Sequence, residues 1–511
     1  MNELNKTLAF AAVALMLVGA AFYRVPDRTG LNQTFNDQGE PFFPDFKDPL
    51  ASTDLEVVDY DPTTATAARF KVMLKDGKWV IPSHYNYPAD AKDRLAKTAA
   101  GVMDLTKDTI RSDRPEDQEK FEVIDPLDAK TMSLKGRGKR VTLRDKSEKV
   151  LADFIIGKNV HAAPEGSDST PQRYVRVPGQ KRTYGVNVKV DLSTRFADWI
   201  ETNLLKLEAG KVRRVVFDNY KIDPERGPQR GEVLTIERKD ASSPWTMADL
   251  GPDQEMNADK LRAMTDALAD LKIVGVRPKP PGLTRDLKTN GPDKGGITIT
   301  PTTIASLNSK GFYPTRDGRL LSNQGDVIVS TDEGAVYTLR FGEVVIATGE
   351  ELSAGIEEDA AKEKAKAKDP AKKADGTAES RYVMVTVAFD PALLPPEPEP
   401  DANALPTIPD DPFQKAPDDP KRIAEEKEAK EKEDRKKADR EKRIADARKR
   451  VQDLTDRFAD WYYVTPGESF RSIVLDRAAL TRPKGSAPAQ GATPSMPNIP
   501  GFPGIQGLSP H

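Results

Sequence analysis

The stretch Asp191–Trp199, DLSTRFADW, recurs almost unchanged as DLTDRFADW at Asp453–Trp461, 262 positions later. Seven of the nine residues are identical, which chance rarely produces in a phrase that contains both phenylalanine and tryptophan. A chain of 511 residues is too long for a single hydrophobic core, so several domains are expected. The repeated phrase therefore predicts that one domain occurs twice in this chain.

Further matches occur in the same order in both halves. The segments that begin at Trp79 and Trp245 align without a gap at an offset of 166. VTLR at 141–144 resembles YTLR at 337–340, and RYVRV at 173–177 resembles RYVMV at 381–385. The offset thus grows from 166 to 196, 208 and finally 262, and each increase predicts an insertion in the second copy.

Each copy is predicted to combine a hairpin, a helix and several further strands. In the first copy, Lys75, Asp76 and Gly77 form a turn signal between two apolar runs, which is typical of a β-hairpin. In the second copy, Asn257 is a candidate cap for the helix that follows it. Tight turns rather than helical crossovers join most strands, which indicates an α+β fold with antiparallel sheets. The apolar stripes of the two helices, with steps of three, four and three, are Leu95, Thr98, Val102 and Leu105, and Leu261, Met264, Leu268 and Leu271.

The repeat predicts two related units, at residues 54–205 and 212–483, with insertions in the second at 352–380 and 391–450. The second insertion contains a Pro-rich run that is typical of an extended linker. Residues 484–511 are rich in proline and glycine and are predicted to be disordered. We expect the aromatic residues of the repeated phrase to close the core of each unit, although stacking on a ligand is an alternative: Phe196, Trp199, Phe458 and Trp461.

The amino terminus contains a candidate membrane anchor at residues 1–30. The sixteen residues Leu8–Tyr23 carry no charge and lie between Lys6 and Arg24. This is just below the usual spanning length of about 17–25 residues, which flanking residues can extend. A cleaved signal peptide and a buried core helix are the alternatives. The flanking charges barely fix the orientation, but long domains behind a short anchor are readily exported, so we expect residues 24–511 outside the cytoplasm.

A dense run of charge follows the Pro-rich linker. Residues 421–450 contain 14 basic and nine acidic residues, a net charge of +5. Oppositely charged residues four apart favour a helix. Apolar residues at helical spacing appear only late, from Ile444 onward, so we expect an exposed first part and a docked second part. The helix is either a solvated surface arm or a contact for a partner protein or anionic lipid.

Composition excludes several kinds of chemistry. The chain has no cysteine and only three histidines, His84, His161 and His511, which removes thiolate catalysis, disulfides and His-rich metal centres. Its 78 basic and 81 acidic residues give no overall field for nucleic acid. Phosphate-loop, nucleophile-elbow, zinc-protease and calcium-loop motifs do not occur in the sequence. We therefore predict no catalytic, cofactor-binding or metal-binding residues, and we expect a protein that is not an enzyme.

The loop SHYNYPAD at 83–90 holds the remaining candidate surface. It places His84, Tyr85 and Tyr87 between the predicted hairpin and helix. Turn packing is the simpler interpretation of these aromatic residues. The alternative is a binding edge, where exposed Tyr85 and Tyr87 would hold a cell-wall glycan.

The short anchor, DGKWVI at 76–81, YPAD at 87–90, DPLD at 125–128, RYVRV and TYGV at 183–186 together resemble a bacterial family of unknown function. Members of that family are membrane-anchored envelope proteins that often carry this domain in tandem, commonly encoded beside gliding-type ABC transporter components. The resemblance covers residues 1 to about 205 well and the second copy more loosely. It implies a non-enzymatic accessory protein in the periplasm whose partners are integral membrane transporter subunits. A glycan-binding module and an uncharacterised envelope enzyme are the alternatives, and the oligomeric state stays open.

Overall fold

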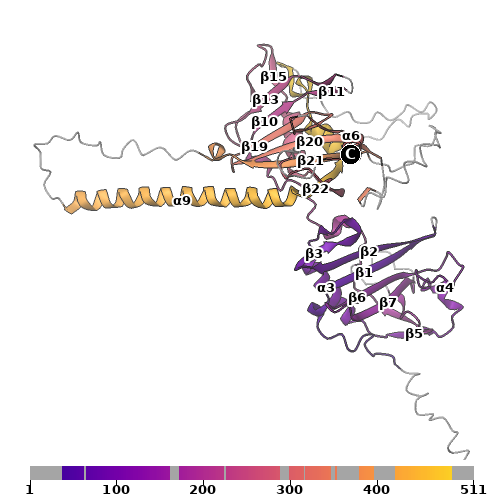
Figure 1. Ribbon diagram of the computed structural model, residues 1–511. Coiled ribbons are helices and arrows are strands. Elements are labelled where there is room, and N and C mark those ends of the chain that lie inside the picture. The colour runs from indigo at the N-terminus through magenta and orange to yellow at the C-terminus, as the bar shows by residue number, and fades with distance from the viewer. Residues whose placement is uncertain are drawn as a thin grey trace, which may run out of the picture. The chain divides into compact units, whose positions relative to one another are not determined.

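The protein consists of two compact units, Met1–Thr202 and Asn203–His511. Each unit is built on one large antiparallel sheet (Figure 1), so the predicted α+β class is confirmed. Among the described residues no helix is long and apolar enough to cross a membrane, and the predicted anchor at 1–30 lies outside them. The computed structural model describes residues 37–62, 65–161, 172–190, 192–223, 226–287, 299–315, 317–346, 352–353, 379–395 and 420–485.

The sheet of the first unit has nine strands in the order β4-β3-β2-β1-β6-β7-β8-β9-β5. Tight turns join β2 to β3 and β6 to β7, as expected for antiparallel neighbours. The elements of this unit are η1 (Pro49–Ala51), β1 (Asp54–Asp61), β2 (Thr66–Lys75), β3 (Lys78–Ile81), η2 (Pro82–His84), β4 (Tyr87–Pro88), α3 (Lys92–Met103), β5 (Thr109–Ser112), α4 (Asp117–Phe121), β6 (Lys139–Arg144), β7 (Val150–Asn159), β8 (Gln172–Arg176), β9 (Thr183–Asn187) and η3 (Phe196–Trp199).

Helix α3 and the short helix η3 meet in the core of the first unit. Trp199 of η3 is fully buried, and its ring lies 5.8 Å from that of Phe70 on β2. The guanidinium of Arg94 on α3 lies 4.9 Å above the same tryptophan ring. The predicted stripe of α3 is confirmed, because Leu95, Thr98, Val102 and Leu105 are all buried.

The sheet of the second unit has eight strands in the order β14-β13-β10-β19-β20-β21-β22-β16. Its elements are η4 (Ala209–Lys211), β10 (Val212–Asp218), β11 (Lys221–Asp223), β12 (Gly227–Gln229), β13 (Val233–Glu237), β14 (Thr246–Met247), β15 (Gln254–Met256), α5 (Ala258–Ala269), β16 (Gly275–Pro278), α6 (Pro301–Ser309), β17 (Phe312–Pro314), β18 (Leu320–Ser322), β19 (Asp326–Thr331), β20 (Ala335–Val345), β21 (Ser380–Phe389), η6 (Pro391–Leu393), α9 (Pro420–Phe458), β22 (Trp461–Pro466), α10 (Gly467–Ile473), α11 (Arg477–Leu480) and β23 (Thr481–Pro483).

Helix α5 of the second unit begins and packs as its sequence predicts. The side chain of Asn257 accepts a hydrogen bond from the backbone N–H of Lys260 at 3.3 Å, which caps the first turn. The apolar stripe is buried at all four predicted positions, Leu261, Met264, Leu268 and Leu271. Helices α3 and α5 both contain 12 residues and begin 166 positions apart, at Lys92 and Ala258.

The two sheets have the same strand order once β4 is set aside. Without β4, the first sheet has the order β3-β2-β1-β6-β7-β8-β9-β5, and the second has the order β14-β13-β10-β19-β20-β21-β22-β16. Strands at the same place in these two orders are counterparts, and they also follow one another in the same order along the chain. The ladders give the offset of each pair. Thr109 pairs with Gly185 in the first sheet, and Gly275 pairs with Val464 in the second. Thr109 and Gly275 lie 166 positions apart, so the two ladders match their partners, Gly185 and Val464. These partners are 279 positions apart, whereas the sequence comparison predicts an offset of 262 for the segment at 191–199 that follows.

The repeated phrase that suggested the duplication occupies different positions in the two units, so that part of the alignment is wrong. In the first unit Phe196 and Trp199 follow β9, whereas in the second Phe458 ends α9 and Trp461 begins β22, the counterpart of β9. Phe196, Trp199 and Phe458 are buried, as predicted for core residues, but Trp461 is only half-buried. Seven identical residues carry less positional information than a ladder of hydrogen bonds.

The match between VTLR and YTLR is also displaced. VTLR lies in β6, but YTLR lies in β20, whose place in the sheet corresponds to β7. Alternating β-branched and charged residues suit many strands, so short matches of this kind arise between neighbours. RYVRV and RYVMV do begin in corresponding strands, β8 and β21.

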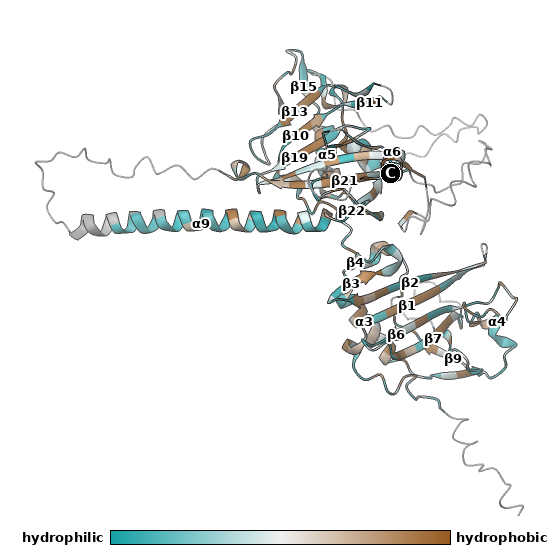
Figure 2. Cartoon of the chain, viewed as in Figure 1, coloured by the Kyte–Doolittle hydropathy of each residue, from teal (hydrophilic) through white to brown (hydrophobic). Residues whose placement is uncertain are grey.

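Helix α9 is inserted between two adjacent strands of the second sheet. Six residues, 177–182, join β8 to β9, whereas 71 residues, 390–460, join β21 to β22. Described residues of α9 from 427 to 443 are exposed except for half-buried Lys436, and Figure 2 shows hydrophilic colour along this part. Docking begins near half-buried Ile444 and is completed by the buried residues Val451, Leu454 and Phe458. The predicted division into an exposed part and a docked part is thus confirmed for the described residues.

Candidate functional site

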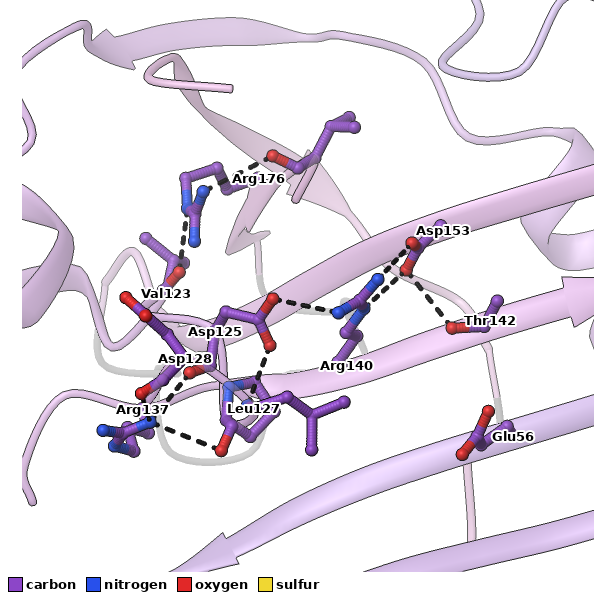
Figure 3. Close-up of polar contacts among 12 residues, drawn as sticks. Glu56, Val123, Asp125, Leu127, Asp128, Arg137, Arg140, Thr142, Asp153 and Arg176 are labelled. Carbon is purple, nitrogen blue, oxygen red and sulfur yellow. Dashed lines mark hydrogen bonds and ion pairs between the residues drawn. The ribbon is translucent and has the colours of Figure 1, made fainter. Parts of the chain in front are cut away.

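A network of charged contacts surrounds the loop between α4 and β6, residues 122–138 (Figure 3). An apolar cluster of Phe121, Val123 and Ile155 anchors the start of this loop. The ring of Tyr174 on β8 stacks on Phe121 with centroids 4.2 Å apart. The loop contains DPLD at 125–128, one of the phrases that carries the family resemblance.

One arginine holds the loop through its backbone carbonyls. The guanidinium of Arg137 donates to five carbonyl oxygens, at distances of 2.6–3.3 Å, and it lies 4.8 Å from the ring of Tyr60. The planar fork of arginine suits such a task because its donors point in several fixed directions. The five acceptors are the carbonyl oxygens of Asp125, Pro126, Asp128, Thr131 and Ser133.

A second arginine joins the loop to the sheet. Arg140 on β6 contacts Asp125 of the loop at 2.9 Å and Asp153 on β7 at 2.6 Å. Thr142 also donates to Asp153, at 3.2 Å. The hydrogen bond with Asp153 and the nearby carboxylates outweigh partial burial and raise the pKa of Arg140. The Arg140 guanidinium therefore stays charged across the physiological pH range.

A third arginine closes the network from β8. Arg176 is only 5% exposed and donates from Nε to the carbonyl of Val123 at 2.9 Å and from Nη1 to that of Gln180 at 2.9 Å. Burial lowers the pKa of Arg176, against the opposing charges of Asp125 and Asp128. All three arginines therefore bind groups of the chain itself.

The network is suited to holding a loop rather than to proton transfer. A general acid or base works best with a pKa near the working pH. Here, hydrogen bonds from the Thr131 side chain and the Lys130 backbone, together with the charge of Arg137, outweigh slight burial and lower the pKa of Asp128, away from neutrality. Within the described ranges, no group of three or more His, Asp or Glu side chains is placed to hold a metal ion.

Residues 79–295, 217 of the 511 positions, match the model of a family described as a domain of unknown function, DUF4340. The match begins in β3 of the first unit and continues past β16 of the second, so it starts later than the resemblance suggested and crosses the boundary between the units. No curated protein and no solved structure matches the chain. The charged loop at 122–138 lies within the matched range.

The aromatic loop at 83–90 is mostly packed into the first unit. His84 is 3% exposed and stacks on Phe196, with ring centroids 4.1 Å apart and an angle of 3°. Tyr87 is buried, so the prediction of two exposed tyrosines for a glycan is wrong for Tyr87. Tyr85 is exposed and has a left-handed backbone, with φ of 58°. The loop thus offers one exposed aromatic ring rather than a pair.

Sequence reasoning missed a buried amine in the second unit. Lys279 follows β16, and its Nζ atom is buried without a hydrogen-bond acceptor in the described part of the chain. Burial lowers its pKa to about 8, against the opposing charges of Asp460 and Asp286. A lysine of lowered pKa is a better nucleophile at neutral pH. Lys279 is therefore the residue to replace in a test of the enzyme alternative.

The Lys279→Met substitution should stabilise the second unit at pH 7 by about 1–2 kcal/mol, because it removes a buried charge. In the wild type, the folded state binds fewer protons than the unfolded state between pH 8 and 10.5. The free energy of unfolding should therefore rise with pH across this window, and the variant should lose that rise. Urea unfolding from pH 6 to 10.5 measures both effects, with Lys260→Met on the exposed face of α5 as the control. Equal pH profiles in the wild type and Lys279→Met would contradict the prediction.

Proposed function

We propose that this protein is a membrane-anchored accessory or scaffold protein that works outside the cytoplasm without catalysing a reaction. Its proposed partners are integral membrane subunits, such as those of a gliding-type ABC transporter or another envelope complex. The single observation that carries the proposal is helix α9, whose described side chains from 427 to 443 are exposed, except for half-buried Lys436, although they form a regular helix. The predicted anchor at residues 1–30 would hold this helix near membrane partners.

The described side chains of α9 from 427 to 443 are exposed along most of this stretch. At about 1.5 Å per residue, residues 427–443 extend over roughly 26 Å. A helix that is polar on all sides is stabilised by pairs such as Asp439 and Arg443 rather than by a core. The wider segment 421–450 has a net charge of +5. Such a surface suits a partner that is recognised by charge.

The charged loop of the first unit also supports a non-enzymatic role. Arg137, Arg140 and Arg176 bind carbonyl oxygens and carboxylates of the chain itself. In the first unit, the described network thus supplies loop order rather than a converging set of reactive groups. Lys279 of the second unit is an exception, because burial lowers the pKa of its amine. The Lys279→Met substitution tests this residue.

We also propose that the two units arose by duplication of one ancestral unit. The shared strand order supports this proposal. A matching contact supports it independently: Arg173 on β8 donates to the carbonyl of Gly157 at 2.6 Å, and Arg381 on β21 donates to that of Gly342 at 2.9 Å. Each contact ties a strand to the same neighbour in its sheet, β7 in one unit and β20 in the other.

Exchange of the two central helices tests the duplication. Replacing Lys92–Met103 by the sequence of Ala258–Ala269 keeps the length and the pattern of buried positions. We expect the first unit to stay folded and to lose about 1–3 kcal/mol, because Thr98 is replaced by the larger Met264. Circular dichroism during urea unfolding measures the effect. In the control, the sequence of α6, Pro301–Ser309, extended with alanine to the same length, replaces Lys92–Met103. If both replacements unfold the unit equally, the duplication proposal loses its support.

Site-specific crosslinking tests the proposed function, since the chain has no cysteine of its own. Ala438 is exposed on α9, and Ala438→Cys can carry a charged, membrane-impermeant maleimide or a benzophenone maleimide. In intact spheroplasts we expect the impermeant reagent to label Cys at 438, and the photo-crosslinker to capture an integral membrane protein that mass spectrometry identifies. Labelling only after lysis would contradict the location, and capture of wall glycan alone would favour the binding-module alternative.

Two sets of charge variants separate specific recognition from general stickiness. Replacing Lys427, Lys430, Arg435 and Arg443 by glutamine should reduce the capture about tenfold, because charge pairs set partner choice. The matched control replaces Glu428, Glu431, Asp434 and Glu441 by glutamine and should retain the capture. The free energy of unfolding of each unit should change by less than about 0.5 kcal/mol in either set, since the replaced residues are exposed. We expect an equally small change when Pro395–Arg440 is deleted.

A further inference from the structure

The face by which α9 docks continues along the exposed part of the helix as a row of basic residues. The helix packs on β21 and β22, and its residues Val451, Leu454 and Phe458 are buried. Steps of three or four residues stay on one face of a helix. Taken backward from Phe458, such steps lead through Leu454, Val451 and Ala447 to Arg443, Arg440, Lys436 and Lys432. We call the last four residues the basic row.

Helix formation by itself does not explain the basic row. The row lies on the part of α9 that extends past the sheet (Figure 1), where Lys432, Arg440 and Arg443 are exposed and Lys436 is half-buried. Its members are four, four and three positions apart, so like charges are neighbours over roughly 16 Å of helix. Like charges at these spacings destabilise a helix, whereas alternating signs stabilise it. A solvated arm would therefore be more stable without such a row.

The basic row also accounts for the net charge of the exposed arm. Residues 427–443 contain nine basic and six acidic residues, a net charge of +3. The basic row and Glu433 next to it together have a net charge of +3. The other ten charged residues of the arm are five basic and five acidic, so their charges cancel. Because interfaces pair surfaces of opposite charge, the complement of this face is acidic.

The position of the basic row favours a protein over a lipid surface. The row shares a face of α9 with the docked residues Val451, Leu454 and Phe458, so the sheet stands on the side toward which the row points. A flat bilayer laid against the row would meet the second unit first. A helix that binds lipid also needs large apolar side chains to enter the headgroup layer. From 427 to 443 the sequence has no apolar residue larger than alanine.

We propose that the basic row binds the carboxylates of an acidic segment of another envelope protein, which lies alongside α9 next to the second unit. One side of a helix with acidic residues three or four positions apart would match the spacing of the row. A second copy of this chain does not match it by two-fold pairing, because that would place one basic row against the other. The proposal rests on the proposed function and deepens it, since it names the face of α9 and the chemistry of the partner.

Carbodiimide crosslinking of the full chain in its membranes tests this proposal. The reagent activates a carboxylate, and a lysine Nζ in contact with it forms an amide bond while the carbodiimide leaves as a urea. We expect Lys432 and Lys436 to form such bonds with aspartate or glutamate of one other protein, identified by peptide mapping. Lys427 and Lys442, exposed outside the row, are the controls and should form about tenfold fewer. Intermolecular bonds that are absent, that join two copies of this chain, or that form equally at all four lysines would overturn the proposal, as would bonds from the row to residues 396–419 of the same chain alone.

Two matched sets of substitutions separate the basic row from general charge. The readout is photo-capture from Ala438→Cys, a position outside both sets. Replacing the basic row by glutamine should reduce the capture about a hundredfold, whereas removing four basic residues elsewhere should reduce it only about tenfold. Glutamine forms helices about as well as lysine and arginine, so α9 should persist, which circular dichroism checks. The second set is Lys427, Lys430, Arg435 and Lys442, all exposed.

A third variant separates charge from the crosslinking chemistry. Lys432→Arg with Lys436→Arg keeps the charge of the row, so it should retain the photo-capture and lose the carbodiimide product. Loss of the photo-capture in this variant, or equal reductions from the two glutamine sets, would overturn this inference and leave the proposed function standing. If Ala438→Cys with the unchanged row captures no membrane protein, the proposed function is overturned as well.

Discussion

Replacing Trp199 by alanine is expected to destabilise the first unit by about 3–5 kcal/mol, since truncating a buried aromatic residue leaves a large cavity. The side chain is fully buried between Phe70 and Arg94. Its indole N–H donates to the carbonyl of Ser193 at 2.9 Å, so the substitution also removes a hydrogen bond from the segment after β9. Urea unfolding of the full chain, followed by hydrogen exchange to locate the loss, measures the effect.

The control for this prediction is Trp461→Ala, the matching letter of the repeated phrase. Trp461 is half-buried at the start of β22, so its loss should destabilise the second unit by no more than about 1–2 kcal/mol. Protection in the first unit should not change. Equal losses from the two substitutions would indicate equivalent positions and would contradict the register of the sheets.

Replacing Arg137 by methionine is expected to destabilise the first unit by about 2–4 kcal/mol. Methionine fills a similar volume but donates no hydrogen bond, so five carbonyl groups lose a charged donor. Water can reach part of this half-buried site, which keeps the loss below the sum of five separate bonds. Hydrogen exchange should rise first between residues 125 and 136, before the rest of the sheet.

Arg137→Lys is the matched control, because it keeps one positive charge and loses the planar fork. Its loss of stability should lie between those of the wild type and the methionine variant. If lysine restores the wild-type value, the charge alone holds the loop, and the geometric account of the five bonds is wrong.

Elements with a strong local period could be predicted from the sequence. The stripes of α3 and α5 follow the 3.6-residue repeat, and the cap at Asn257 is a property of one side chain and its own first turn. The exposed and docked parts of α9 could also be separated, because apolar residues begin only at Ile444. In each case the residues that decide the outcome lie within a few turns of one another.

The charged loop could be predicted only in part. DPLD marks a turn, but nothing local indicates that Arg137 would bind five carbonyl oxygens between 125 and 133. Every residue has a backbone carbonyl group, so a side chain that binds carbonyl oxygens leaves no pattern of residue types in the sequence. Met132 and Leu134 alternate with polar residues as in a strand, and only the folded loop shows that both point outward.

The sequence by itself determined that two similar sets of elements occur in this chain, because helix periodicity, capping and turn signals depend on nearby residues. Tertiary structure alone decided which strands correspond. The phrase ending in Trp199 follows β9, and the phrase ending in Trp461 enters β22, although their letters nearly agree. Strand register is set by hydrogen bonds between residues far apart in the chain, such as Gly275 and Val464, and by which face of each strand is buried. A short run of identical residues contains no information on which strands pair or on which face of a strand is buried.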